Sequence, residues 1–351
     1  MNTLALFLKE SRKKKDLTLK DLSHLTGIDS TLLSKIERSE RSATKEQIQA
    51  LKMAFPDQKV QLSTLWLAEK LYVEMQDEEM WKEAMVVAEE RMQYVRSQQE
   101  HSKHGFDSTL QQLESLMLRL GKLRQHDSYR IAEALEIEYT HDSNKIEGNT
   151  LTLQETNLVV NKGLTISGKS MQEHLEAVNH YDAIQFIKDM AARKIDITKR
   201  SLLELHYLIL RGIDRENAGR YRSVQVYISG SKHIPPQPYM IEKEMEDFFI
   251  WYESAKKRLH PVILAAEVHQ RVVSIHPFID GNGRTCRLLM NLILLQHGYV
   301  IANIRSDANT KSEYYKALEN SNETHSNDGF IEFVLKTEIK SLEHYLLILN
   351  A

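Results

Sequence analysis

The stretch HPFIDGNGRTCR, residues 276–287, separates two segments that have the apolar periodicity of helices. Pro277 disfavours the helical conformation of His276, so the first helix is predicted to end there. Gly281 and Gly283 carry no Cβ, and the backbone can therefore turn tightly and approach a ligand closely. The free N–H groups that begin the second helix would face this loop and attract an anion.

The side chains of this loop are those that phosphoryl transfer requires. A histidine such as His276 can act as a general base, and an aspartate such as Asp280 can hold Mg²⁺. Arg284 and Arg287 can clamp phosphate oxygens. A plain glycine-containing turn between two helices would explain the glycines, but not the fixed order of the other residues.

The whole stretch is similar to the signature of the Fic family, His-Pro-Phe-x-Asp/Glu-Gly-Asn-Gly-Arg-x-x-Arg, and matches it at every defined position. The resemblance implies an all-helical core that transfers a nucleotidyl group, usually AMP from ATP, to a Ser, Thr or Tyr hydroxyl of a target protein. It implies His276 as the general base and Asp280 as the ligand of Mg²⁺. The nucleotide-binding residues that it implies are Gly281, Asn282, Gly283, Arg284, Arg287, Tyr314, Tyr315 and Asn322. Adjacent tyrosines are also commonly packing residues.

A second stretch, SNKIEGN at residues 143–149, ends another predicted helix. Ser143 and Glu147 are one turn apart and share a face. The helix dipole disfavours a carboxylate at this end, so Glu147 requires an explanation beyond that of an ordinary surface residue. The stretch resembles the inhibitory motif of Fic proteins, in which the glutamate pairs with the second signature arginine. The resemblance implies that Glu147 pairs with Arg287 and inhibits the enzyme.

Residues 219–231 have the alternating pattern of a strand, followed by a turn at Ser229-Gly230. The segment resembles the Fic flap, a β-hairpin whose edge receives a segment of the target protein by strand addition. A hairpin without that role would have the same pattern. The predicted flap residues are Val224, Gln225, Val226, Tyr227 and Ile228.

Residues 1–55 predict short helices with a glycine turn, at Gly27, between the second and third, which is the pattern of a helix-turn-helix. The segment is similar to the Cro/repressor family. The similarity includes Glu37, which follows the apolar pair of the predicted third helix. The resemblance implies DNA binding and a possible homodimer, in which each chain would bind one half-site of the DNA. The segment has eleven Lys or Arg against seven Asp or Glu, a modest excess, so a protein-binding bundle is the alternative. The expected DNA contacts come from Ser30, Thr31, Ser34, Lys35 and Arg38.

Six prolines and thirteen glycines in 351 residues predict a mainly α protein. Pro56-Asp57 marks a boundary. We expect a helix-turn-helix domain at 1–55, a helical linker at 56–105 and a Fic domain with an N-terminal inhibitory helix at 106–351. Cys286 is the only cysteine, which excludes a disulfide framework and a cysteine-based zinc site. Because no signal-peptide pattern or bilayer-length apolar run is visible, we expect a cytoplasmic protein without a membrane partner.

The sequence therefore predicts a protein adenylyltransferase that uses ATP and Mg²⁺ and is inhibited by Glu147. Three alternatives stay open. The chain could be a transcription regulator whose Fic unit senses nucleotide, although His276 and Asp280 argue against an inactive sensor. It could transfer another group, such as UMP or phosphocholine. It could also remove AMP, with Glu147 orienting a water molecule.

Overall fold

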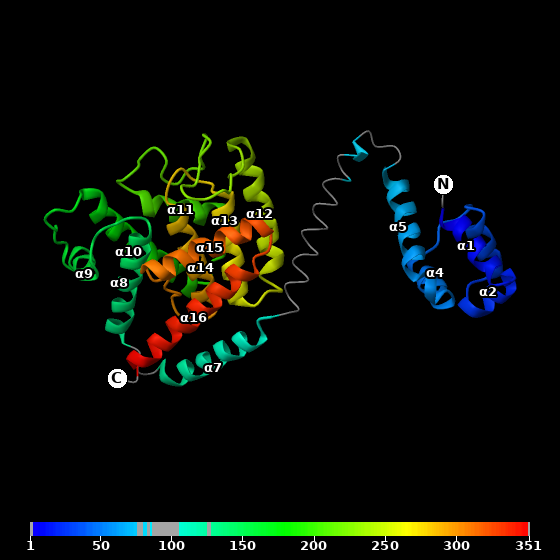
Figure 1. Cartoon of the computed structure of the whole chain (residues 1–351), viewed down its shortest axis with the longest axis horizontal. Helices are drawn as coiled ribbons and strands as arrows, with labels where there is room; N and C mark the ends of the chain where they lie inside the picture. Colours follow the sequence, from blue (N-terminus) through cyan, green and yellow to red (C-terminus); the bar gives the residue numbers. More distant parts are fainter. Residues whose placement is uncertain (1–2, 76–79, 83–84, 86–104, 125–127, 350–351) are drawn as a thin grey trace. The chain divides into compact units, whose positions relative to one another are not determined.

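The computed structural model describes residues 3–75, 80–82, 85, 105–124 and 128–349, and the chain divides into two compact units, Met1–Arg96 and Ser97–Ala351 (Figure 1). Every regular element within the described ranges is a helix, so the mainly α prediction is confirmed. None of these helices is long and apolar enough to cross a membrane.

The N-terminal unit is a bundle of short helices whose first residues are set by capping side chains. The Thr18 hydroxyl accepts from the Asp21 N–H, and the Asp21 carboxylate accepts from the Thr18 N–H, which completes a capping box. Gly27 is left-handed (φ 70°) between the second and third helices, and Asp29 caps the third. The helix-turn-helix prediction is confirmed. The helices are α1 (Leu4–Lys14), α2 (Leu19–Thr26), α3 (Ser30–Glu37) and α4 (Lys45–Ala54).

A fifth helix, α5 (Lys59–Met75), follows the short 3₁₀ turn η1 (Pro56–Gln58) and packs on α1 and α4. Leu62 of α5 is fully buried, and the Trp66 indole N–H donates to the Ala43 carbonyl at 2.7 Å. These contacts tie α5 to the N-terminal unit. The linker expected at residues 56–105 includes this helix, and its residues 76–79, 83–84 and 86–104 lie outside the described residues.

A buried ion pair joins α1 to the end of α3. The Arg12 guanidinium donates to both oxygens of Glu37, from Nε at 2.6 Å and from Nη2 at 2.7 Å, and the two side chains are 12% and 5% exposed. The hydrogen bond to Glu37 raises the pKa of Arg12. Such a bidentate pair fixes the angle between the two helices as well as their distance.

The C-terminal unit is built around α14, which is buried on all sides. Figure 1 shows α14 in the middle of this unit, with α10 on one side and α13 on the other. The buried residues of α14 include both signature arginines, so this helix carries Arg284 and Arg287 into the core. The helices are α7 (Asp107–Leu123), α8 (Tyr129–Ile146), α9 (Leu153–Lys162), α10 (Met171–Ala192), α11 (Lys199–Leu210), α12 (Ile241–Ala255), α13 (Pro261–Ile275), α14 (Asn282–Gln296), α15 (Ala308–Thr324) and α16 (Asp328–Leu349), with the 3₁₀ turn η3 (Pro238–Met240) before α12.

The hairpin predicted for the flap is absent from the described residues, and this prediction is corrected. The return segment contains Pro235 and Pro236, which have no N–H to complete a strand ladder. Side chains join the two segments instead. The Arg222 guanidinium donates to the Val224 carbonyl at 3.0 Å and to the Pro236 carbonyl at 2.6 Å, and the Gln225 amide donates to the Pro235 carbonyl at 2.9 Å.

Replacing Glu37 by alanine is expected to destabilise the N-terminal unit by about 3–5 kcal/mol, because it leaves the charge of Arg12 buried without its partner. Amide hydrogen exchange of α1 and α3 in the full chain would measure the loss. Glu40→Ala is the matched control, since Glu40 pairs with Arg38 at an exposed position. Equal exchange in the two variants would contradict a structural role for the buried pair.

Candidate active site

The loop between α13 and α14 is fixed by its own side chains. His276 ends α13 in the left-handed conformation (φ 51°, ψ 58°), so the helix stops where Pro277 predicts, although His276 is not extended. The Asn282 amide donates to the Phe278 carbonyl at 2.9 Å and accepts from the Phe278 N–H at 3.1 Å. Asn282 is buried, and its side chain holds the loop closed.

His276 is held in a form that can accept a proton. Its Nδ1 lies 3.1 Å from the Val273 carbonyl oxygen, which can only accept, so Nδ1 carries the hydrogen. The lone pair is then on Nε2. Burial lowers the pKa of His276 below its ordinary value, and Arg222 and His233 lower it further. A neutral imidazole at pH 7 is the form that general-base catalysis requires.

Asp280 is the exposed acid of the loop, with its side chain 60% accessible. Its Oδ1 accepts from the Gly281 N–H at 2.6 Å, and its Oδ2 lies 3.1 Å from Nη2 of Arg284. The described residues contain no cluster of three or more metal-ligating side chains. A single exposed carboxylate still fits Mg²⁺, which commonly takes one or two carboxylates together with substrate phosphates.

Arg287 is the most deeply placed cation of the loop, with 1% of its side chain exposed. Its Nη2 donates to Glu147 Oε1 at 2.7 Å and to the Ser143 carbonyl at 2.9 Å, and its Nε donates to Ser143 Oγ at 3.0 Å. Burial raises the pKa of Glu147, but the charges of Arg287 and Arg284 outweigh it and lower the pKa overall. The structure therefore brings Ser143, Glu147 and Arg287 into one contact.

Glu147 also lies against the first turn of α14. A Cβ on Gly283 would come within 2.4 Å of Glu147 Oε1 and 3.0 Å of Arg287 Nη1. No side chain caps this helix, so its first N–H groups are not used by a capping residue. The carboxylate thus occupies the place where the helix dipole and a buried guanidinium both favour an anion.

Comparison with known proteins gives the family. The Fic/DOC family matches residues 196–294, and the family described as helix-turn-helix matches residues 8–55. A Fic domain-containing signalling protein from Bacteroides thetaiotaomicron is 30% identical, with a TM-score of 0.62 over 69% of this chain and 97% of that one. The chain belongs to the Fic/DOC family.

Two further relatives are informative. The protein adenylyltransferase Fic of Drosophila sechellia is 36% identical over 265 residues, which is 75% of this chain. The chain spans about half, 52%, of the length of that relative. Fic-1 (residues 134–508) of C. elegans is 24% identical with a TM-score of 0.61 over 99% of this chain and 98% of that one, a likeness in fold alone.

Two side chains that support the Fic loop were not predicted. The His206 ring stacks on Phe278, with centroids 3.6 Å apart, and its Nε2 lies 2.9 Å from the Asp280 carbonyl. The Arg222 Nε donates to the His276 carbonyl at 2.8 Å. One feature of the sequence points to His206, because it lies within an apolar run and a polar side chain on a buried face requires a hydrogen-bond partner. Which partner that is depends on a contact far along the sequence.

The three nucleotide-binding residues expected on α15 differ in exposure. Tyr314 is buried, and its hydroxyl lies 3.0 Å from His269 Nε2, so it packs against α13. Tyr315 is 45% exposed and can line an open surface. Asn322 is partly buried, and its Oδ1 accepts from Ser274 at 2.7 Å, which leaves its amide N–H groups for a ligand.

The residues expected to contact DNA lie on or just after α3. The side chains of Thr31, Lys35 and Arg38 are exposed, and those of Ser30 and Ser34 are partly buried. Asp29 caps the helix and accepts from the N–H groups of residues 31 and 32. The outward face of α3 thus combines two cations with short hydroxyl side chains.

Ser143→Ala is expected to lower the stability of the C-terminal unit by about 1–3 kcal/mol, because it removes the acceptor for a buried guanidinium N–H. Urea unfolding would measure it as a lower midpoint at unchanged slope. In a background with Trp66 and Trp81 replaced by Phe, Trp251 alone would report on this unit, since the chain has three tryptophans.

The matched control is Ser312→Ala, at an exposed position of α15. It should leave the midpoint within about 0.5 kcal/mol of the parent. If Ser143→Ala behaved in the same way, the hydrogen bond between Arg287 and the Ser143 hydroxyl would not contribute to the fold.

Proposed function

We propose that the chain is a protein adenylyltransferase that transfers AMP from ATP to a Ser, Thr or Tyr hydroxyl of a protein. The observation that carries this proposal is the juxtaposition of a neutral base and a built anion site. His276 and the first turn of α14 belong to one loop, and the Glu147 carboxylate lies at that turn on Arg287. Relatives that are 36% and 39% identical are named protein adenylyltransferase Fic, which supports the same reaction.

In the proposed reaction, His276 Nε2 takes the proton from the target hydroxyl as its oxygen attacks the α-phosphorus of ATP. The new bond joins that oxygen to the α-phosphorus, and the bond to the bridging oxygen breaks, so diphosphate leaves. The backbone N–H groups that begin α14 stabilise the charge at the α-phosphate, and Arg284 grips the leaving phosphates. Asp280 would hold Mg²⁺, which would offset charge on the phosphates.

The pKa of His276 predicts the acid side of the pH profile. A base must be neutral to act, and burial places the pKa of His276 below 6.5. Activity should therefore persist as the pH falls through 6.5 and decline only below it.

A segment of the target protein would lie along residues 224–228, where Val224 and Tyr227 are exposed and the backbone forms no β-ladder within the described residues.

Glu147 would restrain this reaction by occupying Arg287, the anchor proposed for the γ-phosphate. With the carboxylate in place, ATP could still enter, but its phosphates could not take the position that directs the α-phosphate toward the attacking hydroxyl. A misplacement of that kind suppresses the rate strongly. The inhibited state is thus one in which the protein supplies its own anion.

Glu147→Gly is expected to raise self-labelling with labelled ATP and Mg²⁺ by roughly ten- to a thousand-fold, because it frees Arg287 for the γ-phosphate. Arg287→Ala should give no such rise, since it removes both the ion-pair partner of Glu147 and the residue proposed to bind the γ-phosphate. The double variant should behave like Arg287→Ala. If Glu147→Gly were as inactive as the parent, autoinhibition by this residue would be wrong.

His276→Ala in the Glu147→Gly background is the catalytic control. It should abolish labelling and leave ATP binding within a few-fold, because the imidazole acts on the target hydroxyl. Labelled UTP and CDP-choline in parallel reactions would identify another transferred group, and a pre-adenylylated substrate would reveal removal of AMP. Faster labelling by either alternative donor would contradict the proposal for ATP.

We also propose that the N-terminal unit binds DNA through α3, with two copies of the chain supplying the two half-sites. Lys35→Ala should weaken binding to the DNA upstream of its own gene by about tenfold, because the lysine contacts a base or a phosphate. Fluorescence polarisation at several salt concentrations would measure this. Lys59→Ala on α5 is the matched exposed control. Absence of salt-dependent binding even at low salt would favour a protein-binding bundle.

A further inference from the structure

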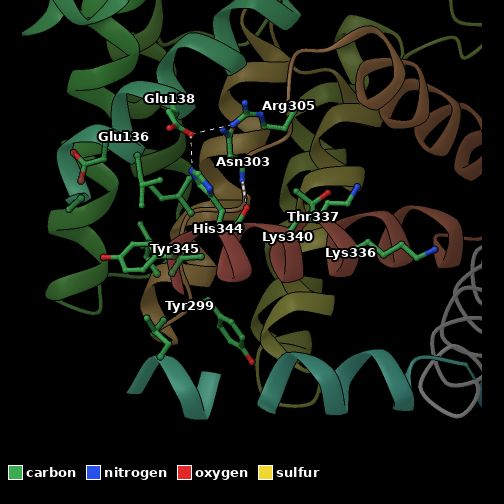
Figure 2. Close-up of a pocket in the computed structure, with 18 of the residues that line it drawn as sticks. Glu136, Glu138, Tyr299, Asn303, Arg305, Lys336, Thr337, Lys340, His344 and Tyr345 are labelled. Carbon is green, nitrogen blue, oxygen red and sulfur yellow. Dashed lines mark hydrogen bonds and ion pairs between the residues drawn. The ribbon is translucent and has the colours of Figure 1, made fainter. Parts of the chain in front are cut away.

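A cavity of about 340 Å³ lies in the C-terminal unit away from the signature loop. It opens between α8, α16 and residues 298–305, and no residue of the loop 276–287 lines it (Figure 2). Its apolar walls include Leu120, Leu135, Leu295, Val300 and Phe333. Walls of this kind favour a hydrocarbon or aromatic group over water.

The polar groups of the cavity carry an excess of positive charge. Five Lys or Arg line it against three Glu. Figure 2 shows Glu138 between Arg305 and His344. Glu138 lies 3.2 Å from Arg305, so this ion pair is already formed. The His344 Nε2 lies 3.4 Å from Glu138 but is buried and makes no hydrogen bond within the described residues. Lys340 has no ion-pair partner in the described part of the chain. The other three lining cations are bound to protein acceptors: Lys188 to Glu136, Lys336 to Glu332 and Arg124 to the Gly298 carbonyl.

Asn303 adds one further unsatisfied group. Its side-chain N–H donates to Asp142 Oδ2 at 2.9 Å, whereas its Oδ1 is buried with no hydrogen-bond partner in the described residues. Buried acceptors of this kind are normally satisfied by protein, water or a ligand. Besides Lys340, Glu313 has no ion-pair partner within the described residues, so the cavity still carries a net positive charge. An apolar space with a few polar groups left unsatisfied has the features of a small-molecule site.

We propose that this cavity binds a small organic acid with an apolar body, its carboxylate at Lys340 and its hydrocarbon against the apolar walls. A neutral hydrocarbon would leave the free cation unused, and a short acid would leave the walls empty. An acid with both parts satisfies these two features at once. Its carboxylate cannot donate to Asn303 Oδ1, so that oxygen is left to a water molecule.

The cavity is connected to the inhibitory end of α8. Arg305 lies 3.2 Å from Glu138 and 3.5 Å from Asp142, both on α8. Although burial opposes it, hydrogen bonds from His141, Ser306 and Asn303 lower the pKa of Asp142 to about 2, so it stays charged. Asp142 directly precedes Ser143. A ligand that fits only when α8 is packed as here would therefore hold Glu147 on Arg287, a consequence that rests on the proposed autoinhibition.

Calorimetry on the full chain with octanoate, 1-octanol and acetate would test the site without any activity. Octanoate should bind at least about tenfold more tightly than 1-octanol, the equivalent of one ion contact of about 1.4 kcal/mol. Acetate should not bind detectably. Lys340→Gln should reduce octanoate to the affinity of 1-octanol, whereas Lys316→Gln, exposed on α15 outside the cavity, should not. Equal affinities for octanoate and 1-octanol in the parent would overturn the assignment.

A second pair of variants tests the place of binding. Ala132 lines the cavity and Ala134 is exposed on the same helix. Ala132→Phe should fill the space and abolish octanoate binding, while Ala134→Phe should leave it unchanged, with both melting like the parent. Octanoate binding that survived Ala132→Phe would place the ligand elsewhere and reject the site. The Lys340 result decides the question if Ala132→Phe does not fold.

The regulatory consequence has its own measurement. Octanoate should slow amide exchange at residues 141–149 of the parent, and it should leave the labelling rate of Glu147→Gly unchanged although that variant still binds it. Unchanged exchange on binding, or equal inhibition of Glu147→Gly, would reject the coupling to Glu147. If Glu147→Gly proved inactive with ATP, the proposed function would fail while the calorimetric result stood by itself.

Discussion

A guanidinium buried near the start of α14 constrains which groups of the C-terminal unit must pack around it. Arg287 is 1% exposed, and a charge so placed is costly by several kcal/mol unless it is paired and hydrogen-bonded. Ser143 accepts hydrogen bonds from two N–H groups of Arg287, but its hydroxyl and carbonyl carry no negative charge to neutralise the guanidinium. The remaining requirement is an anion. Helix α8 packs beside α14 and is followed by Glu147, which provides this anion.

The two partners of this ion pair differ in how easily they can leave. Glu147 is one-third exposed, whereas Arg287 has no route to water. Glu147 follows the last turn of α8, where the dipole of its own helix disfavours a carboxylate, so its position depends on Arg287 and on the first turn of α14. In the proposed mechanism a phosphate would compete for Arg287, the largest of the charges that attract Glu147, while Arg284 and Lys311 attract it as well.

The sequence carries the parts of the site that depend on local order. The signature loop predicts where α13 ends, and the spacing of Ser143 and Glu147 predicts that they share a face. Their contact with Arg287 was predicted by the resemblance to the Fic inhibitory motif. The sequence does not predict a contact when the partner residue is distant along the chain or has no characteristic pattern. The alternation of residues 224–228 indicates a strand, but Pro235 and Pro236 remove the donors of the return strand, and Arg222 holds the segment instead. Only the fold shows that Arg222 also holds the His276 carbonyl, or that His206 stacks on Phe278.

Gly283 leaves room for the Glu147 carboxylate beside Arg287. With a Cβ there, the nearest oxygen of Glu147 would lie 2.4 Å away, so this carboxylate would have to shift. The glycine is helical, so its value lies in the absent side chain and not in an unusual backbone conformation. In the proposed mechanism the carboxylate and the phosphate would use the same opening beside Gly283. We therefore expect the proposed inhibition to be relieved by substitution in α8 and not by substitution of Gly283.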